Sequence, residues 1–588
     1  MNDLTLVAIN AKYPHTNLAV RYLREAVSGF QLEIYEGSVN DSIHGMVDRL
    51  LDMDGKIYGF SCYIWNIEIV HKLAEIIKKA RPEAIILFGG PEVSYEGESI
   101  AKHYPYVDAV ITGEGEAPLK DFLFSLSSGK EIISDKIILA ESFDHHTANT
   151  LQGNIESEKL IELDSNQIKF PYSVDELRAL QNRIIYYETM RGCPYNCSYC
   201  LSSADKKLQV RNLELVLNEI DIFFAADVKQ VKLVDRTFNC LPDRAMTIFD
   251  HIVKKGRQKL RDKKAYPNFH FELTGDYIPD QMIDILKKAP VGLLQFEIGV
   301  QSTCDKTLKA IGRSISFSEI SRNVERLLKA KNIHIHLDLI AGLPYESFEI
   351  FKKSFNDVYM LQADMLQLGF LKGLKGTRIW EESYIHGYSF ADFSPYEIIR
   401  NNYLEASELY VLRNMESLLD RYYNSGYFET VLNYILIEEN ILNPFEFFFR
   451  FCTWWKKKGY FQIGVSKENL YALLYEFVNC EKMIASQIFE DALAFDFIVN
   501  NQQKMPDFLK VKQLDKQKIF NLIENENYQH YFLEFSGLAT KKIFNRIKVV
   551  EFDCSFCEYL FGKNQSHGAI KDTKALVLFT PEQYYYLK

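Results

Sequence analysis

The sequence predicts an α/β protein built from three parts: an N-terminal doubly wound, Rossmann-like domain, a partial (βα)6 barrel and a mainly helical C-terminal domain. Short apolar strands alternate with amphipathic helices over residues 1–125, and further strand–helix units follow over residues 182–380. From residue 381 to residue 588 longer helical patterns dominate. Residues 126–181 show little periodicity and are predicted to be a linker. The 588 residues suffice for three or four domains of about 150 residues each.

Three loops of the first domain stand where a parallel sheet binds its ligands. Strands are predicted at residues 4–8, 32–35, 57–61, 84–88 and 107–111. Ligands of doubly wound sheets bind beyond the carboxyl ends of the strands. The last three strands end in Ser61-Cys62-Tyr63-Ile64-Trp65-Asn66, in Gly89-Gly90-Pro91-Glu92-Val93-Ser94 and in Gly113-Glu114-Gly115-Glu116. Glycines in such loops let a large flat ligand approach the backbone, although simple tight turns would also explain them.

A cluster of three cysteines opens the second domain. Its strands are predicted at residues 184–189, 231–235, 269–273, 293–299, 333–340 and 365–368. The first strand runs directly into Arg191-Gly192-Cys193-Pro194-Tyr195-Asn196-Cys197-Ser198-Tyr199-Cys200. Three thiolates can hold three corners of a 4Fe-4S cluster and leave one iron open. Zinc normally takes four ligands, and disulfide frameworks belong to small secreted chains, so both explain the motif less well.

The Cys-x3-Cys-x2-Cys spacing resembles the signature of the radical S-adenosylmethionine (radical SAM) enzymes. In that family the open iron chelates S-adenosyl-L-methionine, and one electron cleaves it to methionine and a 5′-deoxyadenosyl radical. The resemblance implies that Cys193, Cys197 and Cys200 are the metal ligands. It implies cofactor contacts at Tyr199, Asp235, Glu272, Glu297, Gln301, Ser302 and Asp338, where the two glutamates either face the barrel mouth or pair with Lys or Arg. After Asp338-Leu339-Ile340-Ala341-Gly342-Leu343-Pro344, the residues Tyr345-Glu346-Ser347 depart from the usual Gly-Glu-Thr.

The glycine loops ahead of this motif resemble the cobalamin-binding domain of cobalamin-dependent radical SAM proteins. By that resemblance Ser61, Asn66, Gly89, Gly90, Ser94, Gly113 and Glu114 are candidate cobalamin contacts. The first loop lacks an Asp-x-His-x-x-Gly motif, and His15 within it is expected to be solvated. We therefore expect cobalt to lack a histidine from this protein.

The C-terminal third resembles an uncharacterised helical extension of some cobalamin-type radical SAM proteins, which implies no function. Helices are predicted at residues 396–413 and 415–424, and a short strand at residues 575–579. The aromatic run at residues 445–455 is expected to pack in a core rather than to stack on a base. Cys554 and Cys557 are expected to be unligated thiols, although half a metal site or a redox pair would also fit. The pair His145-His146 is expected in a solvated loop.

Bulk properties limit the partners. The net charge of −11 argues against a surface that wraps nucleic acid. No secretory signal and no membrane span are visible, and ten cysteines in so long a chain suit a reducing cytoplasm. We expect a small-molecule substrate and an electron donor such as flavodoxin or ferredoxin.

These features favour a cobalamin-dependent radical SAM enzyme that transfers a methyl group to an unactivated carbon or phosphorus. A non-methylating radical rearrangement or cyclisation would use the same cofactors. A tRNA methylthiolating enzyme needs three cysteines in its first domain, where this chain has only Cys62. A non-catalytic carrier of corrinoid or cluster is a further alternative.

Overall fold

The computed structural model describes residues 2–143, 169–203, 208–313, 315–439, 442–484, 486–500, 505–535, 537–562, 574–581 and 583–587. The chain divides into two compact units. The first comprises Met1–Ala363 and Leu368–Leu409, and the second comprises Asp364–Gln367 and Tyr410–Lys588. The predicted pair His145-His146 lies outside the described residues.

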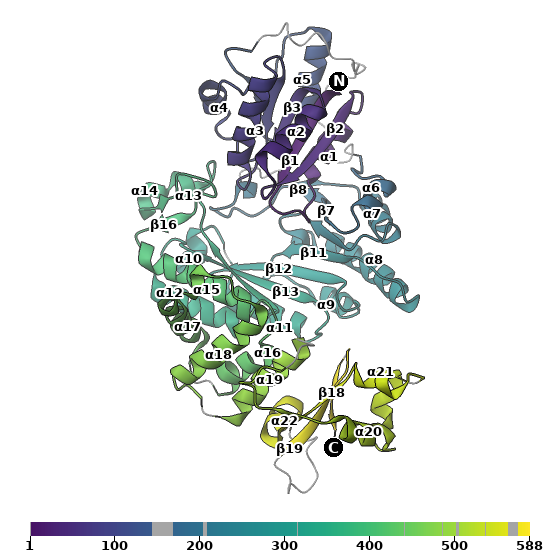
Figure 1. Ribbon diagram of the computed structural model, residues 1–588. Coiled ribbons are helices and arrows are strands. Elements are labelled where there is room, and N and C mark those ends of the chain that lie inside the picture. Colours follow the sequence, from purple (N-terminus) through teal and green to yellow (C-terminus); the bar gives the residue numbers. More distant parts are fainter. Residues whose placement is uncertain are drawn as a thin grey trace. The chain divides into compact units, whose positions relative to one another are not determined.

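The N-terminal domain is a doubly wound sheet, as predicted, with the strand order β2-β1-β3-β4-β5-β6 (Figure 1). Its parallel strands are β1 (Asn2–Asn10), β2 (Leu32–Ser38), β3 (Gly55–Ser61), β4 (Ile85–Gly89) and β5 (Ala109–Ile111). Its helices are α1 (Leu18–Ala26), α2 (Ile43–Asp52), α3 (Ile67–Ala80), α4 (Gly97–His103) and α5 (Glu116–Ser128). The carboxyl ends of the parallel strands therefore share one edge of the sheet.

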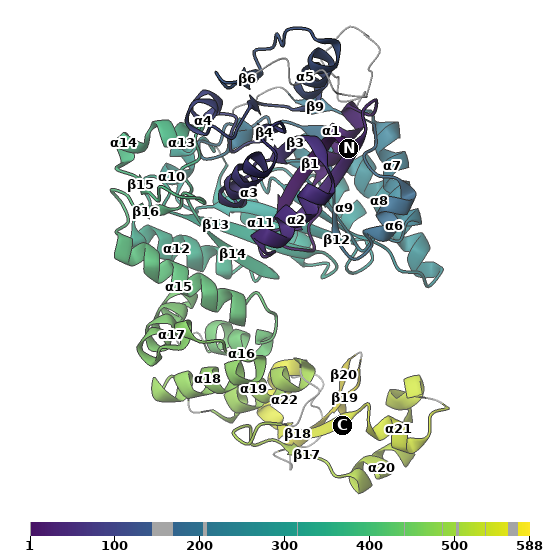
Figure 2. The same ribbon diagram turned by 45° about the horizontal axis from the view of Figure 1, so that its top comes forward.

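Both faces of this sheet are buried, which is why its strands are apolar almost without interruption. In β1, Val7 and Ile9 pack in one core cluster with α2 and α3, which Figure 2 shows on one face of the sheet. Leu4, Leu6 and Ala8 pack in the other cluster with α1 and α5. Successive strand side chains point to opposite faces, so one strand serves both cores.

A sixth strand falls within the range predicted as a linker. β6 (Ile137–Leu139) pairs antiparallel with β5 and extends the N-terminal sheet. Three residues are too few for an alternation pattern, so local periodicity could not identify it. The same range also holds α6 (Val174–Ala179), whose N-cap is Ser173.

The second domain has the predicted partial-barrel strands in the order β14-β13-β12-β11-β10-β7. They are β7 (Ile184–Tyr187), β10 (Gln230–Leu233), β11 (Asn268–Leu273), β12 (Leu294–Gln301), β13 (His334–Ala341) and β14 (Met365–Phe370). The helices between them are α7 (Leu213–Ala225), α8 (Pro242–Arg261), α9 (Asp280–Leu286), α10 (Asp305–Ala310), α11 (Phe317–Leu328) and α12 (Phe348–Tyr359). In β12, Leu294, Phe296 and Ile298 are fully buried, while the intervening Gln295 and Glu297 are half-buried. This alternation leaves polar side chains on the inner face of the barrel.

Short elements complete the first unit. They are β8 (Met190–Arg191), which pairs with β9 (Gln209–Val210), the 3₁₀ turns η2 (Leu201–Ser203) and η3 (Phe238–Cys240), the helices α13 (Arg378–Glu381) and α14 (Ser383–His386), and the paired strands β15 (Ser389–Phe390) and β16 (Ile398–Arg400).

The C-terminal region is mainly helical, as predicted, but the helix expected at residues 396–413 is wrong. Ile398–Arg400 is a strand, and the helix α15 runs instead from Ala406 to Tyr422. Tyr396 has a positive φ of 55°, a left-handed conformation that interrupts a helix before this strand. The aromatic run packs in a core as expected, with Phe447, Phe451 and Trp455 fully buried.

The rest of this region combines helical elements with a small four-stranded sheet, of which periodicity predicted one strand. The helical elements are α16 (Glu429–Asn433), the π-helical turn η4 (Tyr434–Glu438), α17 (Pro444–Lys458), η5 (Tyr460–Gln462), α18 (Lys467–Cys480), α19 (Gln487–Asn500), α20 (Lys516–Glu524), η6 (Gln529–Phe535), α21 (Thr540–Phe544) and α22 (Cys554–Phe561). The antiparallel strands are β17 (Lys512–Gln513), β18 (Lys548–Asp553), β19 (Lys574–Phe579) and β20 (Tyr584–Leu587). Cys554 and Cys557 lie in the first turn of α22, where the Cys557 side chain is buried.

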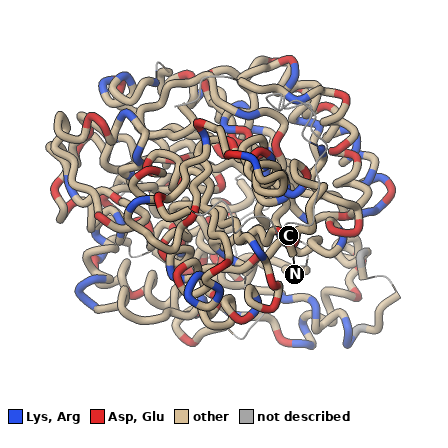
Figure 3. The backbone as a smooth tube through the Cα atoms, turned by 90° about the horizontal axis from the view of Figure 1, so that it is seen from above, with Lys and Arg blue, Asp and Glu red and all other residues tan. Residues whose placement is uncertain are grey.

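Acidic and basic residues are interspersed along the chain in the view of Figure 3. Within the described ranges, no helix combines the length and apolarity that crossing a membrane requires.

Candidate functional site

The three cysteines lie in one loop that follows β7 and β8, and we call residues 192–200 the cysteine loop. Cys193 is buried with its Sγ 3.6 Å from Thr237 Oγ1, while Cys197 and Cys200 are half-buried. All three are free thiols. Ser203 Oγ donates to the carbonyls of Cys197 and Cys200, at 2.9 and 2.6 Å, and so fixes the turn between them.

The donor set suits an iron–sulfur cluster, because three soft thiols share one loop next to a polar barrel mouth. Among the described residues, no three His, Cys, Asp or Glu side chains converge as a finished metal centre. The ligand role of Cys193, Cys197 and Cys200 therefore rests on their spacing and stays a prediction.

Asp235 holds the strand that leads into the cysteine loop. Its Oδ1 accepts from the backbone N–H of Thr189 at 2.8 Å, and its Oδ2 accepts from the Thr189 hydroxyl. Burial raises the pKa of Asp235 to about 7, against the lowering effect of these hydrogen bonds. Because both carboxylate oxygens have protein partners, the placement favours a positioning role, and direct cofactor contact stays a prediction.

The two predicted glutamates pair with basic residues, which was one of the two alternatives. Glu297 Oε2 accepts from His270 Nε2 at 3.0 Å and lies 3.3 Å from Lys232 Nζ. Burial opposes ionisation of Glu297, but these partners outweigh it and lower its pKa. Glu272 Oε2 lies 4.0 Å from Arg236, and burial raises its pKa. The cofactor roles of both glutamates are untested.

Two polar atoms of the barrel have no partner and could receive a ligand. Gln301 Oε1 and Asp338 Oδ1 are buried and make no hydrogen bond within the described parts of the chain. Burial and the neighbouring carboxylates of Glu297 and Glu272 raise the pKa of Asp338 well above its usual range. Buried polar atoms are normally satisfied, so these two fit a site for S-adenosyl-L-methionine, which carries several donors. Tyr199, also predicted there, is half-buried, and its hydroxyl lies 3.5 Å from Arg313 Nη1.

Ser302 bonds to residues other than Gln301 and Asp338. It is fully buried, and its hydroxyl donates to Glu346 Oε1 at 2.5 Å. Ser354 Oγ donates to the same oxygen at 3.0 Å, and burial raises the pKa of Glu346 to about 7. The geometry makes Ser302 a support for the Gln301 loop, while its predicted cofactor contact is untested.

The predicted cobalamin contacts come together at one edge of the N-terminal sheet. Asn66 Nδ2 donates to the carbonyls of Ile9 and Ser61, at 3.0 and 2.8 Å, and so holds the β3 loop (residues 61–66). Ser94 Oγ donates to Gly90 O at 2.8 Å and accepts from Gly113 N at 3.0 Å. Ser94 thereby joins the β4 loop (residues 89–96) to the β5 loop (residues 112–116).

Two glycines of these loops differ in how closely other atoms approach their backbone. Gly90 has a φ of 117°, and a Cβ at this position would lie 2.5 Å from Cys62 O. Gly113 has a φ of 72°, and a Cβ there would meet no atom within 4 Å. Gly89 precedes Gly90 at the end of β4, where an added Cβ would make only ordinary contacts. The β5 loop therefore presents open backbone next to a tightly packed β4 loop, and the role of both loops in cobalamin binding stays a prediction.

Arg191 connects the β5 loop to the cysteine loop. Its guanidinium lies 2.9 Å from Glu116, 3.0 Å from Glu188 and 3.4 Å from Glu114. Glu114 also accepts from Gln209 Nε2 at 3.0 Å. The two predicted cofactor loops therefore lie side by side, joined two residues before Cys193.

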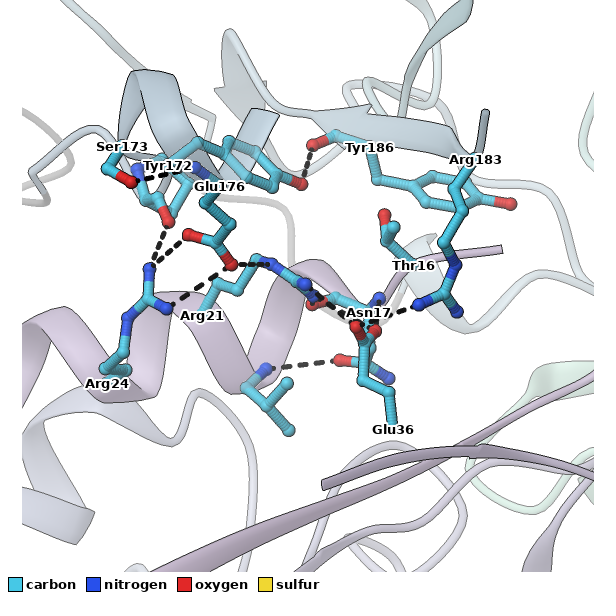
Figure 4. A network of polar contacts seen from close by, with 12 residues as sticks. Thr16, Asn17, Arg21, Arg24, Glu36, Tyr172, Ser173, Glu176, Arg183 and Tyr186 are labelled. Atoms are coloured by element: carbon cyan, nitrogen blue, oxygen red, sulfur yellow. Dashed lines mark hydrogen bonds and ion pairs between the residues drawn. The ribbon is translucent and has the colours of Figure 1, made fainter. Parts of the chain in front are cut away.

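A buried ionic network joins the first domain to α6 and to the residue that precedes β7 (Figure 4). Arg21 of α1 donates to Glu36 through Nη1 and Nη2, at 3.0 and 2.8 Å, and to Glu176 of α6 through Nε at 2.9 Å. Arg24 and Arg183 add cations next to Glu176 and Glu36. Sequence periodicity gives no sign of these contacts.

The expectation that His15 is solvated is wrong. The ring is half-buried and its Nδ1 lies 2.6 Å from Tyr186 Oη. Burial is the main cause that lowers the pKa of His15, and nearby Lys and Arg side chains lower it further. His15 therefore belongs to the contact between the first domain and β7.

Comparison with known protein families identifies three regions. Residues 4–123 match the B12 binding domain, and residues 187–358 match the radical SAM superfamily. The chain is a radical SAM enzyme that carries a B12 binding domain. Residues 385–579 of this enzyme match a protein family of unknown function, DUF4080. The resemblance to cobalamin-binding radical SAM proteins with a C-terminal extension is confirmed, and so are the cofactors: a 4Fe-4S cluster, S-adenosyl-L-methionine and cobalamin.

Named relatives support the same placement. The radical SAM enzyme is 24% identical to the uncharacterized methyltransferase PH0819 of Pyrococcus horikoshii over 62% of this chain and 77% of the relative. It is 28% identical to 2-(S-pantetheinyl)-carbapenam-3-carboxylate methyltransferase of Streptantibioticus cattleyicolor over 53% of this chain, which spans only 46% of that relative. Its fold matches the cobalamin-dependent S-adenosylmethionine radical enzyme OxsB with a TM-score of 0.56 and 14% identity, over 91% of this chain and 83% of that one.

Several residues of the site escaped prediction from the sequence. Arg191, Glu116 and Glu188 form the tie between the loops, and His270 and Glu346 hold predicted residues in place. Only Arg191 gave a signal, since a cation next to three thiols in one loop invites a search for its counter-ions.

Proposed function

We propose that this enzyme is a cobalamin-dependent radical SAM methyltransferase that methylates an unactivated carbon or phosphorus of a small molecule. The observation that carries the proposal is the tie between Arg191 and Glu114 and Glu116. A methyl donor and a hydrogen-abstracting group must reach the same substrate atom, so their binding loops must be neighbours. Two relatives that are named as methyltransferases support the same reaction class.

The chain's own residues bind and orient the cofactors. Cys193, Cys197 and Cys200 would hold the cluster, and Gln301 and Asp338 would meet S-adenosyl-L-methionine. When bound, the cluster with S-adenosyl-L-methionine supplies a hydrogen-abstracting radical, and cobalamin supplies the methyl group. Asp235, Glu346 and Arg191 each fix a loop that carries predicted contacts, which limits the motion of the reacting groups.

The balance of atoms fixes what the reaction consumes. A C–H or P–H bond of the substrate breaks and a C–CH3 or P–CH3 bond forms. The hydrogen atom leaves in 5′-deoxyadenosine together with methionine, and the methyl group of a second S-adenosyl-L-methionine leaves S-adenosylhomocysteine behind. Two electrons enter from a donor protein, for which flavodoxin or ferredoxin is proposed.

The test measures two products separately in anaerobically purified enzyme with cluster, cobalamin and a chemical reductant. We expect 5′-deoxyadenosine to require the cluster, and S-adenosylhomocysteine to form once per bound corrinoid without substrate. A Cys197→Ala variant should lose 5′-deoxyadenosine and keep corrinoid. Formation of 5′-deoxyadenosine without any corrinoid-dependent S-adenosylhomocysteine would favour a non-methylating radical reaction and contradict the proposal.

A tRNA methylthiolating function is not favoured. Such enzymes need a second cluster in the first domain, where Cys62 is the single cysteine and is fully buried.

A further inference from the structure

A loop between β14 and β16 reaches both predicted cofactor sites, and we call residues 371–398 the bracket. Its two ends pair with each other: Ile398 N donates to Leu371 O and Gly373 N donates to Tyr396 O, each at 2.9 Å. Leu371 N also donates to Ala341 O at the end of β13, at 3.0 Å. The bracket is thus a closed loop anchored to the barrel, with α13 and α14 at its far end (Figures 1 and 2).

One side of the bracket contacts the cysteine loop. Ile379 N, in the first turn of α13, donates to Ser198 O at 2.9 Å. The neighbouring Arg378 donates to Ala310 O at 3.1 Å. Ser198 lies between Cys197 and Cys200, so the bracket fixes the backbone between two predicted cluster ligands.

The other side contacts the β3 and β4 loops. Tyr396 Oη donates to Glu92 Oε1 at 2.6 Å, and Ser394 Oγ donates to Ile64 O. Lys375 forms an ion pair with Glu96. One segment of the chain therefore holds both loops, although it lies far from them in the sequence. Tyr396 and Glu92 are 304 residues apart, and Ser394 and Ile64 are 330 residues apart.

Gly376 shows that this contact is closely fitted. Its φ is 82°, and a Cβ at this position would lie 2.3 Å from the ring of Tyr95. A side chain at this position would displace the Tyr95 ring, and the positive φ would strain any residue other than glycine.

We propose that the bracket is a positioning element of the cobalamin site, which holds the β3 and β4 loops at a fixed place relative to the cysteine loop. The inference rests on cobalamin binding in the proposed function. It gives a role to the start of the DUF4080 region, which matches from residue 385 and includes Ser394 and Tyr396. If the bracket only packed the two domains together, its polar contacts would not need to end on the β3 and β4 loops.

The test compares the double variant Tyr396→Phe/Lys375→Gln with the control Tyr384→Phe/Lys353→Gln. The control makes the same substitutions at Tyr384, which is 84% exposed, and at Lys353, whose ion pair with Asp357 is on the surface of α12. Hydroxocobalamin is titrated by equilibrium dialysis into the full chain with its cluster assembled. Iron content and the rate of 5′-deoxyadenosine formation are measured in parallel.

We expect the double variant to bind hydroxocobalamin about tenfold more weakly, because two polar contacts to the loops are lost. Its iron content and 5′-deoxyadenosine formation should match those of the control. A Gly376→Ala variant should weaken binding in the same direction without removing a polar group.

Unchanged corrinoid affinity in the double variant, with a wild-type chain that binds corrinoid, would overturn the bracket's role. Loss of iron along with corrinoid would also overturn it, since the bracket would then only stabilise the unit. If the wild-type chain binds no corrinoid, the proposed function itself fails.

Discussion

Replacement of Arg21 by methionine tests the ionic network that joins the first domain to β7. The Arg21 side chain is 3% exposed and makes charge-assisted bonds to Glu36 and Glu176. Removing one partner from a buried ion pair costs about 3–5 kcal/mol, because the other charge stays buried. Arg183 and Arg24 remain near the two carboxylates, at 3.4 and 3.0 Å, so we expect a cost near the lower end, about 3 kcal/mol.

Hydrogen exchange across residues 172–187 measures this cost in the full chain, where a single unfolding transition is not expected. A cost of about 3 kcal/mol lowers protection about a hundredfold. The control is Arg178→Met on the same segment, where Arg178 is 65% exposed and pairs with an exposed Asp175. Exposed pairs contribute about 0–1 kcal/mol, so this control should change protection little. Equal protection in the two variants would refute the reasoning.

Three further predictions concern the same unit. Burial acts to raise the pKa of Glu36, but Arg21 and Arg183 lower it overall. The ionised Glu36 carboxylate therefore stabilises the native state above the ordinary glutamate pKa of about 4.3, and this stabilisation is lost as the pH falls through the lower native pKa. Protection of residues 172–187, corrected for intrinsic exchange, should therefore drop below about pH 4.3 in the wild type, and should drop less in Arg21→Met, where Arg183 still lowers the pKa of Glu36. Arg191→Met should weaken hydroxocobalamin binding more than Glu116→Gln does. Glu116→Gln should in turn weaken it more than Glu114→Gln, because Glu116 is 10% exposed and Glu114 is 42% exposed. The reverse order of affinities in equilibrium dialysis would argue against a role for the ion pairs of Arg191. Glu346→Gln keeps an acceptor for the hydroxyls of Ser302 and Ser354 and should keep the Kd for S-adenosyl-L-methionine within about twofold of the wild-type value. Glu346→Ala should raise this Kd about tenfold. Equal effects of the two variants would show that Glu346 does not position the Gln301 loop.

Local pattern was sufficient for most strands of both sheets. In β1 the apolar residues fill two cores, and the alternation of strands and helices after it predicts the doubly wound sheet. The cysteine spacing predicted the cofactor class because the three cysteines lie within eight consecutive residues. Such signals are local, and a single sequence displays them fully.

Contacts between distant segments could not be predicted in this way. Tyr396 was assigned to a helix, but its backbone is left-handed and its hydroxyl meets Glu92 of the first domain. Ser302 was predicted to contact the cofactor, and its hydrogen bond to Glu346, which lies 44 residues later, could not be predicted from the sequence. The short strand β6 exists because β5 offers it an edge, which its own three residues do not reveal.

The most direct test of adjacent cofactor sites is the electron spin relaxation of bound cob(II)alamin with the cluster reduced. We predict faster relaxation in the wild-type chain than in a Cys193→Ala/Cys197→Ala/Cys200→Ala variant that binds corrinoid but no cluster, because Arg191 joins the two loops within one unit. Identical relaxation in both proteins, each loaded with corrinoid, would contradict the placement of the two sites side by side.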